Sequence, residues 1–345
     1  MAEVILDPEL PIIDPHHHLW DRSAGDTDNP LPPKHGFEAM LRRVPRYLFP
    51  ELLADMNSGH RVIGTVYMEC GAMYRQDGDL AFRPVGETEF VNGVAAMSAS
   101  GIYGEARACA GIVGHVDMTL GDRARAVLEA QIAAGGGRFR GIRHSAASDP
   151  DPAVLGPLAR REPGLYLSSA FRQGFAQLAP LGLSFDAWLL EPQLGDLIDL
   201  ARAFPDTTIV LDHVGTPLGI GAYAGRRRER YGVWLESIRA LAALPNVNVK
   251  VGGLAMVFPG FDSYMAEPVA ASATIADEWR PYVEPVIQAF GPSRCMFESN
   301  FPVDHGTCPY DVLWNAFKVL GKAYSADEKT ALFNDTARRV YRLYI

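Results

Sequence analysis

Three consecutive histidines are the first residues whose types and spacing could carry chemistry. His16, His17 and His18 follow the apolar segment Ile12–Pro15, where a short strand would end. Because alternate side chains of a strand face the same way, His16 and His18 share one side and His17 faces the other. Two imidazoles on one side each offer a nitrogen lone pair, which predicts a shared divalent cation. A tag remnant or a chance cluster is the alternative interpretation, but a tag would be a longer run at a terminus.

Three later apolar runs also end in polar side chains. Arg143 and His144 lie at the end of the run Arg138–Arg143, and His213 follows the run Thr207–Leu211. The run Arg294–Glu298 ends at Glu298, and Asn300 and Asp304 come shortly after it. An imidazole at a strand end binds metal, relays a proton or orients a nucleophile. A guanidinium there suits a carboxylate or an oxygen that gains charge. A structural Asp-His pair for His213 and a structural salt bridge for Arg143 are the alternatives.

Eight short apolar runs predict the strands that would hold these residues. Helical segments long enough to return a parallel strand lie between them, at Thr88–Ser100, Gly121–Ala134, Gln193–Ala203 and Tyr231–Leu244. This alternation favours an α/β fold, a single (β/α)8 TIM barrel over residues 1–345. The predicted strands are Ile12–His16, Arg61–Met68, Ala108–Val116, Arg138–Arg143, Leu183–Leu189, Thr207–Leu211, Val247–Val251 and Arg294–Glu298.

Three connections are longer than a barrel needs, and all three follow strands. They are Asp21–Phe37, Thr216–Arg230 and Gly252–Trp279. In a barrel such loops emerge at the carboxyl ends of the strands, where active sites of this fold lie. We therefore expect these loops to form the walls of a pocket. The alternative is that they lie on the surface and take no part in a site.

Composition and charge exclude several classes of protein. The chain has a net charge of −9, which disfavours nucleic acid as the main partner. The basic run Arg226–Arg230 is best interpreted as the start of a solvated helix. Because the chain lacks a long apolar run and begins with an acidic segment, we expect a cytoplasmic protein without a membrane partner. A small molecule is the expected partner, and a homo-oligomer is possible from the sequence. The four cysteines, with no C-x-x-C spacing, are predicted to be reduced and mostly buried.

Taken in barrel order, these motifs resemble the amidohydrolase superfamily. The similarity rests on His16-His17-His18, on Leu-Asp-His213-Val-Gly and on Glu-Ser-Asn300-Phe-Pro, and it extends from Ile12 to Leu343. It is strongest to the amidohydrolase-2 group, which includes sugar-acid lactonases, 4-sulfomuconolactone hydrolase and 2-pyrone-4,6-dicarboxylate lactonase. The resemblance implies that His16 and His18 are metal ligands and that His213 holds a substrate oxygen or the attacking water.

The chain departs from the family pattern at two strand ends, and it has no strand-four lysine for a metal bridge. Glu191 stands where the family has a strand-five His, and Asn300 stands where it has the strand-eight Asp. Because Asn accepts no proton at neutral pH, Asn300 is excluded as general base, which leaves Glu191 or Asp304. Glu191 is also a candidate third ligand to zinc or manganese. Alternatively, Glu191 is a solvated carboxylate, Asp304 caps the next segment, and the site works without metal.

The predicted function is hydrolysis of a lactone or an ester-like carbonyl. A divalent ion, zinc before manganese, would polarise the carbonyl or activate water. His213 and Arg143 would stabilise the oxyanion. The predicted substrate-binding residues are His144, Trp20, Asn300 and Tyr74, which suit a ring-like or acidic substrate. The alternatives are metal-dependent decarboxylation of an aromatic or unsaturated acid, metal-independent lactone hydrolysis, and a binding protein that has lost catalysis.

Overall fold

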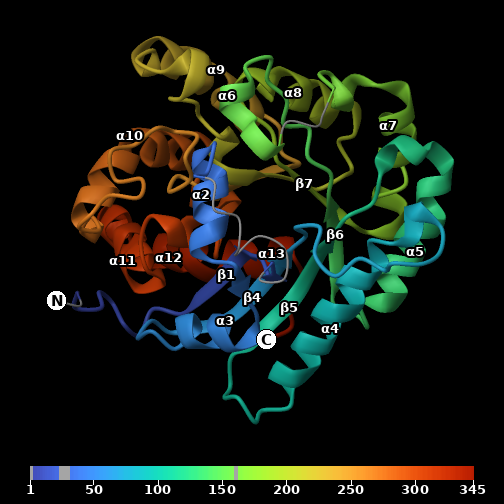
Figure 1. Cartoon of the computed structure of the whole chain (residues 1–345), viewed down its shortest axis with the longest axis horizontal. Coiled ribbons are helices and arrows are strands. Elements are labelled where there is room, and N and C mark those ends of the chain that lie inside the picture. The colour runs from blue at the N-terminus through green and yellow to red at the C-terminus, as the bar shows by residue number, and fades with distance from the viewer. Residues whose placement is uncertain (1–2, 23–31, 159–161) are drawn as a thin grey trace.

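Eight parallel strands curl into one sheet around a common axis, as a computed structural model of the chain shows (Figure 1). The structure describes residues 3–22, 32–158 and 162–345. Neighbours in the sheet follow chain order: β1 (Ile12–His17), β4 (Val62–Met68), β5 (Arg107–Gly114), β6 (Phe139–Arg143), β7 (Ser184–Ala187), β8 (Ile209–Leu211), β9 (Val247–Val251) and β10 (Cys295–Phe297). Each predicted strand is found, with ends shifted by at most two residues.

The first and last strands meet just beyond β10, which brings the sheet close to a closed barrel. His17 forms a parallel bridge with Phe301. The His18 amide donates to the Phe301 carbonyl at 2.7 Å, and the Asn300 amide donates to the His16 carbonyl at 2.9 Å. The predicted (β/α)8 barrel is confirmed, and the contact that completes it runs through two segments that carry candidate site residues.

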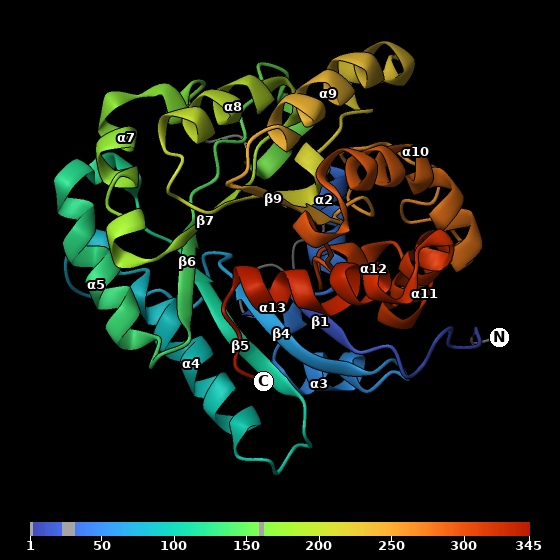
Figure 2. The same cartoon turned by 180° about the vertical axis from the view of Figure 1, so that it is seen from behind.

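Helices cover the outside of the sheet on all sides (Figure 2). The four predicted helices correspond to α4, α5, α8 and α9, and α9 starts at Arg227 within the basic run. The helices are α2 (Gly36–Arg43), α3 (Phe49–Met56), α4 (Val85–Ala99), α5 (Ala124–Ala134), α6 (Pro152–Leu155), α7 (Ser169–Phe175), α8 (Leu194–Ala203), α9 (Arg227–Ala242), α10 (Ser272–Phe290), α11 (Tyr310–Leu320), α12 (Ala326–Thr330) and α13 (Thr336–Val340). A two-stranded ribbon pairs β2 (Trp20–Asp21) with β3 (Arg46–Tyr47).

The apolar side chains separate into an outer layer and an inner plug. The largest cluster of buried apolar residues lies between the strands and the surrounding helices. A second cluster combines strand residues such as Val66 and Val210 with Tyr341 and Leu343 from the end of the chain. Tyr341 also donates to the Asp186 carboxylate of β7 at 2.5 Å, so the C-terminal segment plugs the barrel beneath the site.

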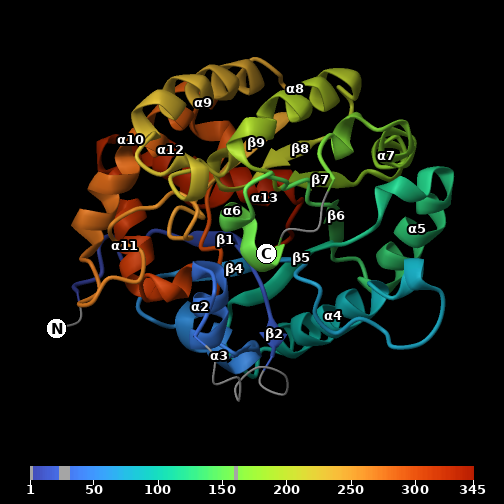
Figure 3. The ribbon, with the colours of Figure 1, turned by 45° about the horizontal axis from the view of Figure 1, so that its top comes forward.

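The long connections lie over the carboxyl ends of the strands (Figure 3). Apolar side chains from these connections form a third buried cluster. It includes Trp20, which directly precedes the first connection, Leu218 from the second and Phe258 from the third, and Phe37 at the end of the first connection packs against it. Residues 23–31 of the first connection lie outside the described part of the chain. That the connections wall a substrate pocket stays a prediction.

Two further expectations concern membrane-spanning helices and the cysteines. None of the helices in the described ranges is long and apolar enough to cross a membrane. All four cysteines are free thiols, and all but Cys70 are buried, as predicted.

Candidate active site

The three consecutive histidines alternate in direction, as the strand pattern predicts. The His17 Nε2 atom lies 2.8 Å from the Thr65 hydroxyl on the far side of β1. His16 and His18 instead bring their Nε2 atoms to 3.3 Å from each other. All three rings are buried, and burial lowers the pKa of both His16 and His18 well below the ordinary value. His16 and His18 are therefore neutral imidazoles at neutral pH.

The contacts of the Nδ1 atoms assign the tautomer of His18 and leave two tautomers for His16. The His18 Nδ1 atom lies 2.8 Å from the Met68 carbonyl oxygen, which only accepts, so this nitrogen carries the proton. The His16 Nδ1 atom lies 2.7 Å from the Glu298 Oε2 atom and 3.3 Å from the Lys250 ammonium. With the proton on its Nε2 atom, His16 accepts from Lys250 and donates to the His18 Nε2 atom. With the proton on its Nδ1 atom, His16 faces the carboxylate, and the Nε2 lone pairs of both rings face each other.

This pair of lone pairs fits a divalent cation. Two nitrogen ligands of a tetrahedral zinc, each about 2.0–2.1 Å from the ion, lie about 3.3–3.4 Å apart. The Nε2 atoms of His16 and His18 are 3.3 Å apart. His16, His213 and Glu298 form a second group of candidate ligands, with one atom of each within 4.8 Å of the others. Because the Glu298 oxygens face Nδ1 atoms, this carboxylate is better placed to orient the histidines than to bind the ion.

Glu298 joins His16 to His213, the histidine at the end of β8. Its Oε1 atom lies 2.7 Å from the His213 Nδ1 atom and accepts the His213 backbone amide at 3.2 Å. The rings of His16 and His213 lie 4.7 Å apart between centroids. The pairing leaves the His213 Nε2 atom as a proton acceptor, as in other carboxylate–histidine pairs. One buried carboxylate thus lies between two imidazoles and is hydrogen-bonded to His213.

Two glycines make room for this arrangement. His213 has φ of +55°, a left-handed conformation that is uncommon outside glycine. A Cβ atom on Gly253, itself at φ +64°, would lie 2.3 Å from the His213 Nδ1 atom, and a Cβ atom on Gly252 would lie 2.4 Å from the Glu298 Cγ atom. The Gly252-Gly253 pair after β9 is therefore a packing requirement of the His213–Glu298 pair.

Arg143, at the end of β6, lies beside the histidines. Its Nε atom donates to the Glu69 carboxylate at 2.8 Å, and its Nη1 atom lies 3.3 Å from the His16 Nε2 atom. Burial alone would lower the pKa of Arg143, but the Glu69 and Asp212 carboxylates raise it above its ordinary value. A fixed positive charge therefore lies next to the candidate cation site.

A buried lysine beneath the histidines is absent from the residues that the sequence pattern singled out. The Lys250 ammonium contacts the Asp186 carboxylate at 2.7 Å and the Asp212 carboxylate at 3.1 Å, and all three side chains are buried. Burial alone would lower the pKa of Lys250, but these two carboxylates raise it. Lys250 is thus charged, and the sequence signal was its inward position in the strand Val247–Val251.

Asn300 and Asp304, from the segment after β10, pair with each other. The Asn300 side-chain amide donates to the Asp304 carboxylate at 2.8 Å, and the Ala255 backbone amide donates to the same carboxylate at 3.3 Å. Burial raises the pKa of Asp304 well above its ordinary value. These contacts join the loops after β9 and β10, which gives Asp304 a structural role beside its predicted one as base.

Glu191 contacts a helix of the neighbouring connection. Its carboxylate accepts from Arg230 at 2.5 Å and from the Leu218 backbone amide at 3.5 Å. It lies outside the group of His16, His213 and Glu298 that the described residues form as candidate ligands. The roles of Glu191 as third ligand and as base therefore stay predictions, and its observed partner is a cation.

The predicted substrate-binding residues occupy different environments. Trp20 lies parallel to His18, with ring centroids 6.1 Å apart, and its indole donates to the Val44 carbonyl. His144 is buried and accepts the Met118 backbone amide at 3.2 Å. Tyr74 is 38% exposed. The structure thus brings Trp20 to the histidines and ties His144, directly after β6, to the loop after β5.

Comparison with known proteins gives one family and several relatives. The model of the amidohydrolase family matches residues 13–343. An uncharacterized protein, y4mH, of Sinorhizobium fredii is 34% identical over 97% of this chain and 99% of its own length. An L-fucono-1,5-lactonase of Burkholderia multivorans is 29% identical over 69% of this chain and 73% of its own length.

Solved structures share the fold along nearly the whole chain. An amidohydrolase of Burkholderia multivorans crystallised with HEPES has a TM-score of 0.71 and 26% identity, covering 96% of this chain and 99% of that one. A second crystal form of that protein, with bound zinc, is 24% identical over the same shares, with a TM-score of 0.71. A 5-carboxyvanillate decarboxylase of Novosphingobium aromaticivorans, with manganese, has a TM-score of 0.58 and 14% identity over 98% of this chain and 97% of its own.

Proposed function

The chain belongs to the amidohydrolase family, and from this premise we propose that it hydrolyses a lactone, or a similar ester-like carbonyl, of a small substrate. The observation that carries the proposal is the Glu298 carboxylate between the Nδ1 atoms of His16 and His213, at 2.7 Å from each. It leaves the Nε2 atoms of two imidazoles available for a cation, a water molecule or a carbonyl oxygen. Family membership and the lactonase relative identify the protein as an enzyme of hydrolase type.

In our proposal His16 and His18 hold a divalent cation through their Nε2 atoms. When bound, this ion supplies Lewis-acid chemistry, either polarising the carbonyl or lowering the pKa of water. The separation of 3.3 Å between the two nitrogens supports this part of the proposal. Zinc is our first choice, since N-ligands suit it and a structural neighbour contains it, and manganese is the second.

His213 is the group that we propose to take the proton from water. Its Nδ1 atom faces Glu298 at 2.7 Å, so its Nε2 atom is the one that accepts. A buried carboxylate stabilises the imidazolium that forms when the proton arrives. This assignment supplies a base although the strand-eight position is Asn300. We favour it over Glu191, whose carboxylate pairs with Arg230, and over Asp304, which accepts from Asn300 and Ala255.

Arg143 completes the proposed site as the stabiliser of the oxyanion. Its guanidinium lies 3.3 Å from the His16 Nε2 atom and is held in place by Glu69. A well-aimed donor to a developing oxyanion contributes roughly 3 kcal/mol. The Trp20 ring beside His18 offers an apolar surface for one face of a ring-shaped substrate. Together these groups favour a sugar-acid lactone, the substrate class that the name of the Burkholderia multivorans relative implies for that protein.

Non-oxidative decarboxylation is the second candidate function. A guanidinium next to a histidine pair suits a substrate carboxylate as well as an oxyanion, and Arg143 has this position. The manganese decarboxylase neighbour shares the fold. Hydrolysis takes precedence because the decarboxylase is only 14% identical, whereas the lactonase is 29% identical over 69% of this chain.

A substrate panel separates the two functions. Purified enzyme is mixed with aldono-1,4- and aldono-1,5-lactones and with hydroxylated aromatic acids, while acid release and carbon dioxide are recorded in parallel. We expect acid release from at least one lactone without carbon dioxide. Carbon dioxide release without lactone opening would contradict the proposal. Arg143→Gln should lose at least about 100-fold in kcat/KM, whereas Arg226→Gln, on the surface beside Glu229, should keep the full rate.

A further inference from the structure

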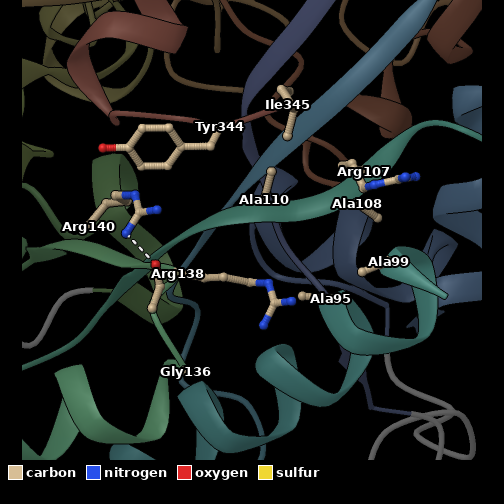
Figure 4. Close-up of a pocket in the computed structure, with 11 residues that line it drawn as sticks. Ala95, Ala99, Arg107, Ala108, Ala110, Gly136, Arg138, Arg140, Tyr344 and Ile345 are labelled. Carbon is tan, nitrogen blue, oxygen red and sulfur yellow. Dashed lines mark hydrogen bonds between the residues drawn. The ribbon is translucent and has the colours of Figure 1, made fainter.

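A cavity lined by arginines lies at the amino ends of the strands, whereas the histidines lie at the carboxyl ends. Figure 4 shows the residues that line it. Its volume is about 320 Å³. Arg138 directly precedes β6 and Arg140 belongs to its start, whereas Arg143 of the candidate active site ends the same strand. Small side chains of α4 and β5 (Ala95, Ala99 and Ala110) leave the space open, and Tyr344 lies over one edge.

The guanidinium groups at this cavity have neutral hydrogen-bond partners. Arg138 donates to the Asn92 side-chain oxygen at 2.7 Å, and Arg140 donates to the Gly137 carbonyl at 2.7 Å. Arg342 donates to the Arg140 carbonyl at 3.0 Å. The carbonyl oxygen of Ile345, which also lines the cavity, accepts from Arg338 instead. Asn92 and Gly137 satisfy part of the hydrogen-bonding capacity of Arg138 and Arg140 but carry no opposite charge.

The positive charges at the cavity also repel one another. Burial lowers the pKa of Arg140 below its ordinary value, and the nearby Arg342 and Arg138 lower it further. The Arg140 Nε atom is buried and has no hydrogen-bond partner among the residues that the structure describes. In a chain of net charge −9, such an uncompensated cluster of cations is a local exception. An anion between the arginines would offset this repulsion.

We infer that this cavity binds a small polyanion, either a phosphate or a compound with two or three carboxylates. Arginine forks match the paired oxygens of carboxylates and phosphates. The two guanidinium groups of Arg138 and Arg140 would hold the anion, with Arg107 at the far side of the cavity (Figure 4). A volume of about 320 Å³ admits such a molecule as a whole. Because the site lies at the amino ends of the strands, its ligand binds together with a substrate at the other end.

Calorimetric titration tests the inference with two probes, inorganic phosphate and propane-1,2,3-tricarboxylate, at constant ionic strength set with chloride. We expect saturable binding of about one anion per chain by at least one probe. Binding of phosphate alone identifies a phosphate site, and binding of the tricarboxylate alone identifies a carboxylate site. Absence of saturable heat with both probes would overturn the inference.

Substitutions test whether the anion binds in this cavity. The double variant Arg138→Gln/Arg140→Gln should raise the Kd of the bound probe at least tenfold. Ala99→Glu, on an exposed position of α4 that lines the cavity, should have the same effect while it keeps every arginine. Arg226→Gln, a surface arginine on another helix, and Arg143→Gln, at the candidate active site, should both bind as the parent does. Unchanged binding in the Ala99→Glu and double variants, or loss in Arg143→Gln alone, would place the anion elsewhere and contradict the inference.

Discussion

The Nε2 atoms of His16 and His18 face each other across 3.3 Å, while the Nδ1 atom of each ring contacts an acceptor oxygen. Burial lowers the pKa of both rings, which keeps them neutral. A neutral His16 protonated at Nε2 donates a hydrogen bond to His18, whereas a His16 protonated at Nδ1 offers a second lone pair to a divalent cation. The pair could therefore hold a metal ion when the His16 proton is on the Nδ1 atom beside Glu298.

Removal of the proposed metal ion should lower activity. We expect about one divalent ion per chain in protein purified without chelators. Chelation should lower kcat at least about 100-fold, since in the proposed mechanism the ion activates the water. Addition of zinc or manganese should restore the rate. His305→Ala, an exposed histidine outside the site, should keep the metal. Full activity in protein that elemental analysis shows to be free of metal would exclude the ion from the mechanism.

Glu298→Gln should lower activity by its effect on two histidines. The amide keeps the shape of the side chain but loses the charge that orients His16 and His213. Loss of such an orienting carboxylate typically costs about 10–100-fold in activity or metal affinity. The measurement is kcat with thermal unfolding as a control for folding. If Glu298 acts through His213, the same change in a His213→Asn background should have a much smaller effect; equal losses in both backgrounds would contradict this role.

Gly253→Ala should displace the His213 ring. The new methyl group would lie 2.3 Å from the His213 Nδ1 atom, and φ of +64° disfavours a side chain at this position. We expect a loss in kcat of at least tenfold and a lower free energy of unfolding by about 1 kcal/mol or more. Gly232→Ala is the matched control, because Gly232 lies in α9 and a Cβ atom there would point into open space. It should raise stability by about 0.5–1 kcal/mol and leave kcat unchanged.

His60 makes the stability of the protein depend on pH. Burial lowers its pKa to about 4, and its Nδ1 atom lies 2.8 Å from the Lys318 ammonium. Between pH 4 and 6.5 the unfolded chain binds a proton at His60 and the folded chain does not, so this group adds stability as the pH rises through that window.

The variant His60→Gln isolates this effect. The difference in free energy of unfolding between parent and variant should grow from pH 4 to 6.5, by at most about 1.4 kcal/mol per pH unit, and then level off. Urea unfolding at five pH values provides the measurement. Activity at neutral pH should stay unchanged, since His60 contacts the Asp311 carbonyl and Lys318, away from the candidate active site. A difference that is constant with pH would contradict the assignment.

The strands were predictable because barrel strands are buried on both faces and form short apolar runs in the sequence. The direction of His16 and His18 followed from strand alternation, and the placement of Arg143 and His213 followed from strand ends. These features depend on residues close in sequence. They required no knowledge of which strands are neighbours.

The charged network beneath the site required knowledge of the neighbours. Lys250 pairs with Asp186 of β7 and with Asp212 directly after β8, and the three residues meet only when the barrel forms. The partner of Glu191 was hidden for the same reason, because Arg230 follows it by 39 positions on a separate helix. Gly252 and Gly253 were visible as a pair after a strand, but their contacts with Glu298 and His213 are a property of the packed loops.

The most direct test of the proposed hydrolase compares ring opening of an aldono-1,5-lactone by the parent and by His18→Ala. Acid release is followed at constant pH, and the spontaneous rate is subtracted. In a variant whose thermal unfolding midpoint lies within a few degrees of the parent's, we predict a loss of at least about 100-fold in kcat/KM, since the variant lacks one of the two proposed Nε2 ligands. Equal rates for the parent and a folded His18→Ala would contradict the account.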